Sequence, residues 1–347
     1  MAVSVPVAAG PPVAVTTEVS YCAFPYAVVD ATGRAWVAYS NSAGHVSATG
    51  DVRLRFADPG CTWSAPAVVT ASSGGYGVGV GGFAAETAEQ GGKLWLACVR
   101  NKPTSGSTAA DYTTTVRSLD TATGLWTIAV TLPAIATGQT VGSGLLVRPD
   151  GTLLATAYGT PDGGTYTVAK VYAYDRAAGT WAALSTVSLT TRLVQEPTLL
   201  TMADGRLLML FRSDGSAPYY SYIFSVVSAD GGLTWGTPYV VAVHASGMPH
   251  GYVTPSGHIA VTYRGFTEPR NPAASYPPRI MMLNPDGTST GDGAIDVLGG
   301  QTARFLYGRI IAGEPDQFIY SLEGPAGQSG AGAAIYSVPL EWVARSS

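Results

Sequence analysis

The sequence predicts an all-β protein, on the basis of composition, a recurring turn-and-strand phrase and an even spread of hydrophobic residues. The 347 residues include 43 Gly and 19 Tyr, and only 12% are charged, a balance typical of short strands joined by tight turns. Hydrophobic residues make up 46% of the chain, which is enough to bury a core without disulfides or metals.

Charge and cysteine content argue against several classes of partner. The three cysteines lack CxxC spacing and are odd in number, so neither a zinc site nor a disulfide framework is expected, and no cofactor is predicted. The formal net charge is −4 with no run of Lys or Arg, which argues against nucleic acid and anionic lipid as partners. The apolar N-terminus lacks a basic region and is broken by prolines, and no later stretch is long enough to span a membrane. We therefore expect no secretion signal and no membrane insertion.

A polar or Gly turn followed by an alternating apolar strand recurs five times. The instances are DATGRAWVAYS (30–40), EQGGKLWLACVR (89–100), RPDGTLLATAYG (148–159), MADGRLLMLFRS (202–213) and TPSGHIAVTYRG (254–265). Their turn glycines lie 52 to 59 residues apart. Because Gly supplies positive φ, each phrase predicts a hairpin with a two-residue turn. A sixth, degenerate copy is AGEPDQFIYSLEG (312–324).

Six units of this length predict a six-bladed β-propeller with four-stranded antiparallel blades. The whole chain, residues 1–347, is expected to form this single domain. In propellers the chain ends commonly share a blade, so residues 1–20 are expected to complete the last blade beside residues 334–343.

A second phrase separates the first ones, as ADPGCTW (57–63), LDTATGLW (119–126), YDRAAGTW (174–181) and SADGGLTW (228–235). An Asp carboxylate can accept backbone N–H bonds within such a turn, and Trp can pack back over the blade. The four Asp residues, Asp58, Asp120, Asp175 and Asp230, are therefore expected to stabilise hairpins on the outer rim. A further acidic turn at 283–293 could hold calcium, but its irregular spacing favours a solvated turn.

The phrase SADGGLTW at 228–235 fits the S-x-D-x-G-x-T-W pattern called the Asp box, or BNR repeat. On this motif the chain resembles the sialidase (neuraminidase) superfamily over nearly its whole length. Blade four reads Val194-Gln195-Glu196-Pro197-Thr198, then a D-G turn and a strand that carries Arg212. The resemblance implies that Glu196 is a buried general base and Arg212 an arginine that binds the substrate carboxylate. Arg264 falls on the same register in blade five, so two arginines could grip one carboxylate.

Sialidases use a neutral Tyr, activated by Glu, as nucleophile, because an anionic nucleophile would be repelled by the sugar carboxylate. The stretch Phe318-Ile319-Tyr320-Ser321-Leu322 resembles the Tyr-Ser segment of these enzymes, which makes Tyr320 the first candidate nucleophile and Tyr307 the second. His250, after Pro249 at the channel end of blade five, is a candidate base or substrate-binding residue.

Blade one departs from the family pattern. Sialidases carry an Arg-x-Pro motif there, and Ala23 stands where its arginine belongs, in Tyr21-Cys22-Ala23-Phe24-Pro25. Phe24 could instead stack on a sugar face. The following loop offers no obvious acid/base Asp, and Asp51 is the nearest acidic residue.

Three functions follow, all with a glycan as substrate or receptor. The first is a sialidase-like exo-glycoside hydrolase acting on sialic acid or a related acidic sugar. The second is a non-catalytic glycan-binding propeller, of the type found in phage tails or adhesins. The third is a propeller polysaccharide lyase with His250 or a Tyr as base. Such functions imply an encounter with extracellular glycans or a place on a virion, and the sequence leaves the compartment and the oligomeric state open.

Overall fold

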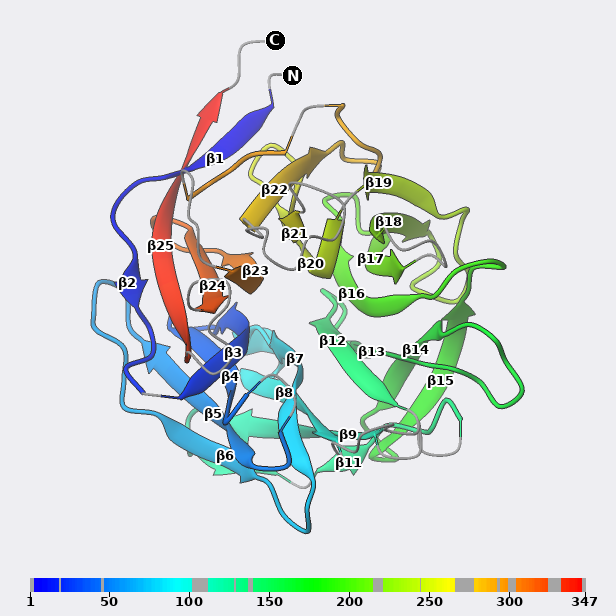
Figure 1. Cartoon of the computed structure of the whole chain (residues 1–347), viewed down its shortest axis with the longest axis horizontal. Coiled ribbons are helices and arrows are strands. Elements are labelled where there is room, and N and C mark those ends of the chain that lie inside the picture. The colour runs from blue at the N-terminus through cyan, green and yellow to red at the C-terminus, as the bar shows by residue number, and fades with distance from the viewer. Residues whose placement is uncertain are drawn as a thin grey trace.

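A computed structural model describes residues 3–18, 20–44, 47–101, 112–127, 129–136, 140–214, 221–243, 245–265, 278–291, 294–298, 304–323 and 332–344. Six antiparallel sheets are arranged around a common axis, with the strand at one end of each sheet innermost (Figure 1). This arrangement confirms the predicted all-β, six-bladed propeller. Within the described residues no helix is long and apolar enough to cross a membrane.

The blades follow one another along the chain. Blade one is β3 (Tyr21–Val29), β4 (Ala35–Ser42), β5 (Gly50–Ala57) and β6 (Ala67–Ala71). Blade two is β7 (Gly77–Ala85), β8 (Lys93–Asn101), β9 (Tyr112–Asp120), β10 (Leu125–Trp126) and β11 (Val130–Thr131), with the short 3₁₀ helix η1 (Ala88–Gln90) between β7 and β8. Blade three is β12 (Val141–Val147), β13 (Leu153–Gly159), β14 (Val168–Asp175) and β15 (Thr180–Val187).

Blade four is β16 (Gln195–Thr201), β17 (Leu207–Asp214), β18 (Ser221–Ser228) and β19 (Tyr239–Val243). Blade five is β20 (Ala245–Val253), β21 (Ile259–Gly265) and β22 (Pro278–Leu283), with isolated bridges to Ser289 and Ile295 on its outer side. Blade six is β23 (Arg304–Ile311), β24 (Gln317–Glu323), β25 (Ala333–Ala344), β1 (Ser4–Ala8) and β2 (Val13–Ala14).

The N-terminal segment closes the ring. β1 pairs antiparallel with β25, from Ser4 opposite Ala344 to Ala8 opposite Leu340, and β2 pairs with the same strand. Figure 1 shows β1 and β25 side by side, with both termini at one edge of the disc. Blade six therefore takes strands from both ends of the chain, and the pairing of β1 with β25 joins the N-terminal and C-terminal strands.

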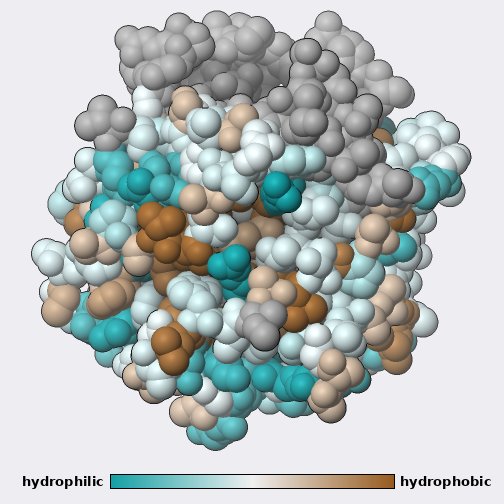
Figure 2. All heavy atoms as spheres, turned by 90° about the horizontal axis from the view of Figure 1, so that it is seen from below, coloured by the Kyte–Doolittle hydropathy of each residue, from teal (hydrophilic) through white to brown (hydrophobic). Residues whose placement is uncertain are grey.

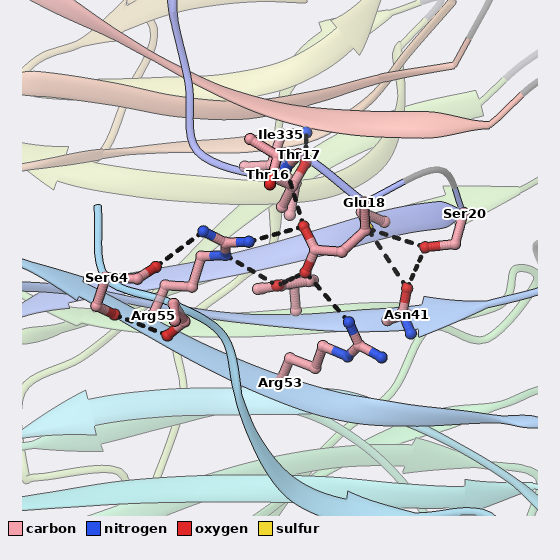
Figure 3. A network of polar contacts seen from close by, with 12 residues as sticks. Thr16, Thr17, Glu18, Ser20, Asn41, Arg53, Arg55, Ser64 and Ile335 are labelled. Carbon is pink, nitrogen blue, oxygen red and sulfur yellow. Dashed lines mark hydrogen bonds and ion pairs between the residues drawn. The ribbon is translucent and has the colours of Figure 1, made fainter. Parts of the chain in front are cut away.

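A network around Glu18 fixes the segment between β2 and β3 (Figure 3). The Glu18 carboxylate accepts hydrogen bonds from Arg55 at 2.9 Å, Arg53 at 3.3 Å and the Tyr39 hydroxyl of blade one. Burial alone would raise the pKa of Glu18, but the hydrogen bond from Tyr39 and the other donors hold it below its usual value. These contacts bind the N-terminal segment to β4 and β5.

The turns between the first and second strands differ from the prediction. Gly205 has φ 86° and donates to the Met202 carbonyl at 2.9 Å, while Met202 donates to the Arg206 carbonyl at 2.8 Å. The same pattern occurs at Gly33, Gly151 and Gly257, so each loop has three residues, a type I turn followed by a left-handed Gly. The predicted two-residue turn was wrong. Type I′ needs positive φ at both central residues, and in the predicted Asp-Gly pairs Gly151 and Gly205 have positive φ while Asp150 and Asp204 do not.

The Asp-box residues lie in turns on the outer side of the blades. The Asp230 carboxylate accepts hydrogen bonds from the Thr234 backbone N–H at 2.9 Å and from Ser228 at 2.8 Å. A further hydrogen bond from the Thr234 hydroxyl, together with these two donors, lowers the pKa of Asp230 to about 2. Trp235 donates its indole N–H to Ser185 of blade three at 2.9 Å, so this box also connects neighbouring blades.

The core lies between the blades. One cluster joins Ile280 and Met282 of blade five to Phe318 and Val338 of blade six. The rim of the disc shows small hydrophobic patches set among hydrophilic and neutral ones (Figure 2). In the acidic turn after β22, the Asp286 carboxylate accepts the Thr288 backbone N–H at 2.9 Å. No cluster of metal-ligating residues occurs in the described ranges.

Candidate functional site

Each of the six inner strands carries a register shift in its pairing with the second strand of its blade. The shifts lie at Ala23/Tyr26, Val80/Gly82, Gly142/Gly144, Gln195/Thr198, Ser246/His250 and Phe305/Gly308. A bulge leaves a residue unpaired and redirects its side chain. The repeated bulge therefore explains how side chains from different blades turn toward the axis.

Two bulged residues have an unusual backbone. Phe24 has φ 56° and Glu196 has φ 50°, and each precedes a proline, Pro25 or Pro197. Residues before proline favour extended conformations, and a left-handed residue other than Gly costs on the order of 1–3 kcal/mol. Strain of this kind is retained where the surrounding structure fixes it, often at functional sites. Here it directs the Phe24 and Glu196 side chains to the axial cavity.

An axial cup of about 200 Å³ receives these side chains. Its lining includes four of the residues singled out in the sequence, namely Phe24, Glu196, His250 and Tyr307. Other lining residues are neutral, among them Tyr26, Tyr112, Tyr158, Asn101 and Met248. The cup thus combines one carboxylate with an aromatic and hydroxyl-rich wall, a lining suited to sugar hydroxyls and sugar faces.

Glu196 and Tyr307 form the central contact of the cup. The Tyr307 hydroxyl donates to Glu196 Oε1 at 2.9 Å, across blades six and four. Arg212 Nη1 donates to Glu196 Oε2 at 3.4 Å, so the carboxylate is held from both sides. Arg212 is itself fixed by the Asp214 carboxylate, with Nε to Oδ1 at 3.2 Å and a shorter contact from Nη2 to Oδ2.

Electrostatics keep Tyr307 neutral and Arg212 charged. Burial raises the pKa of Tyr307 well above its usual value, and the negative charge of Glu196 adds to that effect, while Arg264 and Arg212 oppose it. Burial also disfavours charge on Arg212, but the Glu196 and Asp214 carboxylates outweigh this and raise its pKa. The positive charges of Arg212 and Arg264 therefore both act on the Tyr307 hydroxyl.

Tyr320 lies elsewhere. Its side chain is 1% exposed and belongs to the cluster between blades five and six, stacked on Phe318 at 5.0 Å and Tyr336 at 5.8 Å between ring centroids. The structure brings Tyr307, and not Tyr320, to Glu196. Both residues occur in short aromatic stretches of neighbouring strands, and the sequence alone gives no signal that separates an axial strand from the next one.

His250 and Phe24 line the cup in different ways. The Phe24 ring packs against the Tyr307 ring with centroids 4.9 Å apart. The His250 ring contacts the Arg309 guanidinium at 3.2 Å and meets the Tyr26 ring edge-on at 5.5 Å. Burial, with Arg309 adding to it, lowers the pKa of His250 well below its usual value, so the imidazole is neutral.

Blade one lacks the charge that the family pattern supplies. Ala23 is fully buried and contributes a methyl group where an arginine would stand. Asp51, the nearest acidic residue, accepts from Arg53 at 2.7 Å and from Asn41 at 3.1 Å, so it belongs to the network of blade one. The sequence analysis did not identify Asp214 as the partner of Arg212. The sequence could have indicated it, because residues two apart in a strand lie on the same face.

The fold is that of a six-bladed β-propeller, an architecture that solved sialidases share. The chain belongs to the BNR repeat-like domain family, which matches residues 33–272. Comparison with curated protein sequences finds no match.

Solved structures share this fold at low identity. A protein of unknown function from Dyadobacter fermentans is similar over 99% of both chains, with 14% identity and a TM-score of 0.77. The NanB sialidase of Streptococcus pneumoniae is 12% identical over 94% of this chain and 68% of its own, with a TM-score of 0.68. The α-L-arabinanase of Penicillium chrysogenum, solved with arabinobiose, is 14% identical over 97% and 98%, with a TM-score of 0.58.

Proposed function

We propose that the protein is an exo-acting glycoside hydrolase of sialidase type that acts on an acidic sugar. The observation that carries the proposal is the 2.9 Å hydrogen bond from the Tyr307 hydroxyl to the buried Glu196 carboxylate in the axial cup. A neutral phenol beside a carboxylate base is the nucleophile that suits a sugar with its own negative charge.

In the proposed reaction the Tyr307 oxygen attacks the anomeric carbon, and its proton passes to Glu196. The bond from the anomeric carbon to the leaving oxygen breaks, and this oxygen takes a proton from solvent. Water then attacks the anomeric carbon and breaks its bond to the Tyr307 oxygen, and Glu196 returns its proton to the phenolate. The water loses one proton to solvent, which replaces the proton that the leaving oxygen took. Tyr320 is not assigned a role, because its ring is enclosed by the core between blades five and six.

Arg212 and Arg264 supply positive charge for the substrate carboxylate. Three donor atoms of Arg212 already bond to Glu196 and Asp214, so Arg212 chiefly positions the Glu196 carboxylate and retains part of its donor capacity. Phe24 forms an aromatic wall beside Tyr307 on which a sugar face can stack.

Hydrolysis of 4-methylumbelliferyl N-acetylneuraminic acid tests the proposal. Its aryl leaving group departs without help from a general acid, so the assay does not require an acid residue, and none has been assigned in the cup. We expect release of the fluorophore by the wild-type chain and a loss of about a hundredfold or more in Glu196→Gln and Tyr307→Phe. Tyr320→Phe is the matched control and should keep wild-type turnover. Full activity in Tyr307→Phe would refute the assignment of the nucleophile.

A second candidate function, a non-catalytic glycan-binding propeller, is favoured by Ala23. A missing bidentate arginine removes about 1.5–3 kcal/mol of charge-assisted hydrogen bonding, which reduces affinity for the transition state. Binding to immobilised acidic glycans that Glu196→Gln retains, with no sugar released by the wild type, would establish this function in place of hydrolysis.

A further inference from the structure

A second axial chamber lies next to the cup. Its volume is about 160 Å³, and it is lined by residues that include Tyr26, Phe83, Thr198, His250 and Arg309. Tyr26 and His250 line both spaces, so their rings form the partition between the cup and the chamber. Among the lining residues Arg309 is the one with a permanent charge.

Arg309 is a poorly compensated cation. It contacts the neutral His250 ring at 3.2 Å and the Ala27 carbonyl at 3.5 Å, and its guanidinium carbon lies 4.1 Å from the Tyr26 ring centroid. The Nε atom is buried without a hydrogen-bond partner. No carboxylate of the described residues forms an ion pair with Arg309.

The lack of a counter-charge leaves the effect of burial on the pKa of Arg309 largely uncompensated. Burial lowers the pKa of Arg309 to about 10, so the guanidinium is still cationic at neutral pH. A buried cation without a counter-charge costs several kcal/mol even after local relaxation. Arg212, by contrast, forms ion pairs with two carboxylates, those of Glu196 and Asp214.

We propose that the chamber is a binding site for a halide-sized monovalent anion held by the Arg309 guanidinium. The anion lies in the chamber against the part of the Arg309 guanidinium that lines it and balances the charge, and the volume of about 160 Å³ limits the site to small anions. Arg309 follows Tyr307 by two residues on β23, so the anion sits one step farther along the same axial strand. The site is separate from the Glu196 cup and does not depend on hydrolytic activity.

Bromide is the probe, because it resembles chloride in size and can be located by anomalous diffraction. In crystals of the wild-type chain soaked in sodium bromide, we expect an anomalous peak in hydrogen-bonding range of the Arg309 guanidinium. This measurement needs no variant. A chamber that contains water alone, with no anomalous peak at a saturating soak, would overturn the proposal.

Thermal unfolding in solution provides the second arm, with sodium bromide replacing sodium gluconate at constant ionic strength. At bromide tenfold above its dissociation constant, the unfolding equilibrium constant should fall about tenfold in the wild type. Arg309→Gln should lose this response. Arg100→Gln is the matched control, since Arg100 lies 4.0 Å over the Tyr76 ring but is exposed. If bromide stabilised the wild type and Arg309→Gln equally, the site would not be occupied by anion in solution. Any anomalous peak would then reflect binding at crystal concentration only, and the proposal would be rejected.

Discussion

Replacing Glu18 by Gln tests how strongly the N-terminal segment is locked to blade one. The side chain of Glu18 is 14% exposed, and that of its partner Arg55 is 6% exposed. The substitution keeps the shape but removes the charge that Arg53 and Arg55 face. Breaking a fully buried pair costs about 3–5 kcal/mol.

The expected loss is smaller here. Arg53 keeps its contact to Asp51 at 2.7 Å, and Arg55 keeps the Ser64 carbonyl at 2.8 Å. Because the carboxylate is also partly accessible, we expect about 1.5–2.5 kcal/mol. A domain of this length unfolds with an entropy of about 0.7 kcal/mol per kelvin, so Tm should fall by roughly 2–4 °C.

The pH dependence gives a sharper test. The folded-state pKa of Glu18 lies below its unfolded value of about 4.5, so its contribution to stability is present above that pH. The contribution is lost as pH falls through the folded-state pKa. The wild type and Glu18→Gln should therefore differ at pH 7 and converge in strongly acidic solution, as measured by calorimetry across that range.

Glu89→Gln serves as the control, because Glu89 is a solvated residue of η1 whose pKa is also lowered, by hydrogen bonds with backbone and Thr87. Because Glu89 is fully exposed, solvent screens this contribution, and the substitution should lower Tm at pH 7 by much less than Glu18→Gln does. A Glu18→Gln protein as stable as the wild type at pH 7, or one whose deficit grows on acidification, would refute the reasoning.

Two further substitutions test the turns. Gly205→Ala should lower the free energy of unfolding by about 1–2 kcal/mol, because Gly205 has φ 86° and open space around its Cα, leaving backbone strain as the cause. Urea titration measures this free energy. In the same titration Gly44→Ala should leave the free energy of unfolding unchanged, because Gly44 is equally unobstructed but has no positive φ. Trp235→Phe should cost about 1 kcal/mol or more through its lost bond to Ser185, and an unchanged midpoint would show that this Asp box does not couple the blades.

Part of the candidate site was predictable from the sequence. Glu196 and Arg212 lie in one short stretch, and the hairpin between β16 and β17 brings them together by local register, with Gln195 opposite Arg212. Their contact therefore depends on one blade. The contact between Glu196 and Tyr307 joins residues 111 positions apart, and only closure of the ring sets it.

The sequence by itself determined the all-β class, the six-fold repeat and the turn glycines, because strand alternation and positive φ are local properties that composition and spacing record. The tertiary structure decided which tyrosine faces the axis. Tyr307 and Tyr320 are both buried aromatics on adjacent strands of blade six, but the bulge between Phe305 and Gly308 belongs to the inner strand. It also isolated Arg309 in the axial chamber, since the neighbours of an axial residue come from several blades that are remote in sequence.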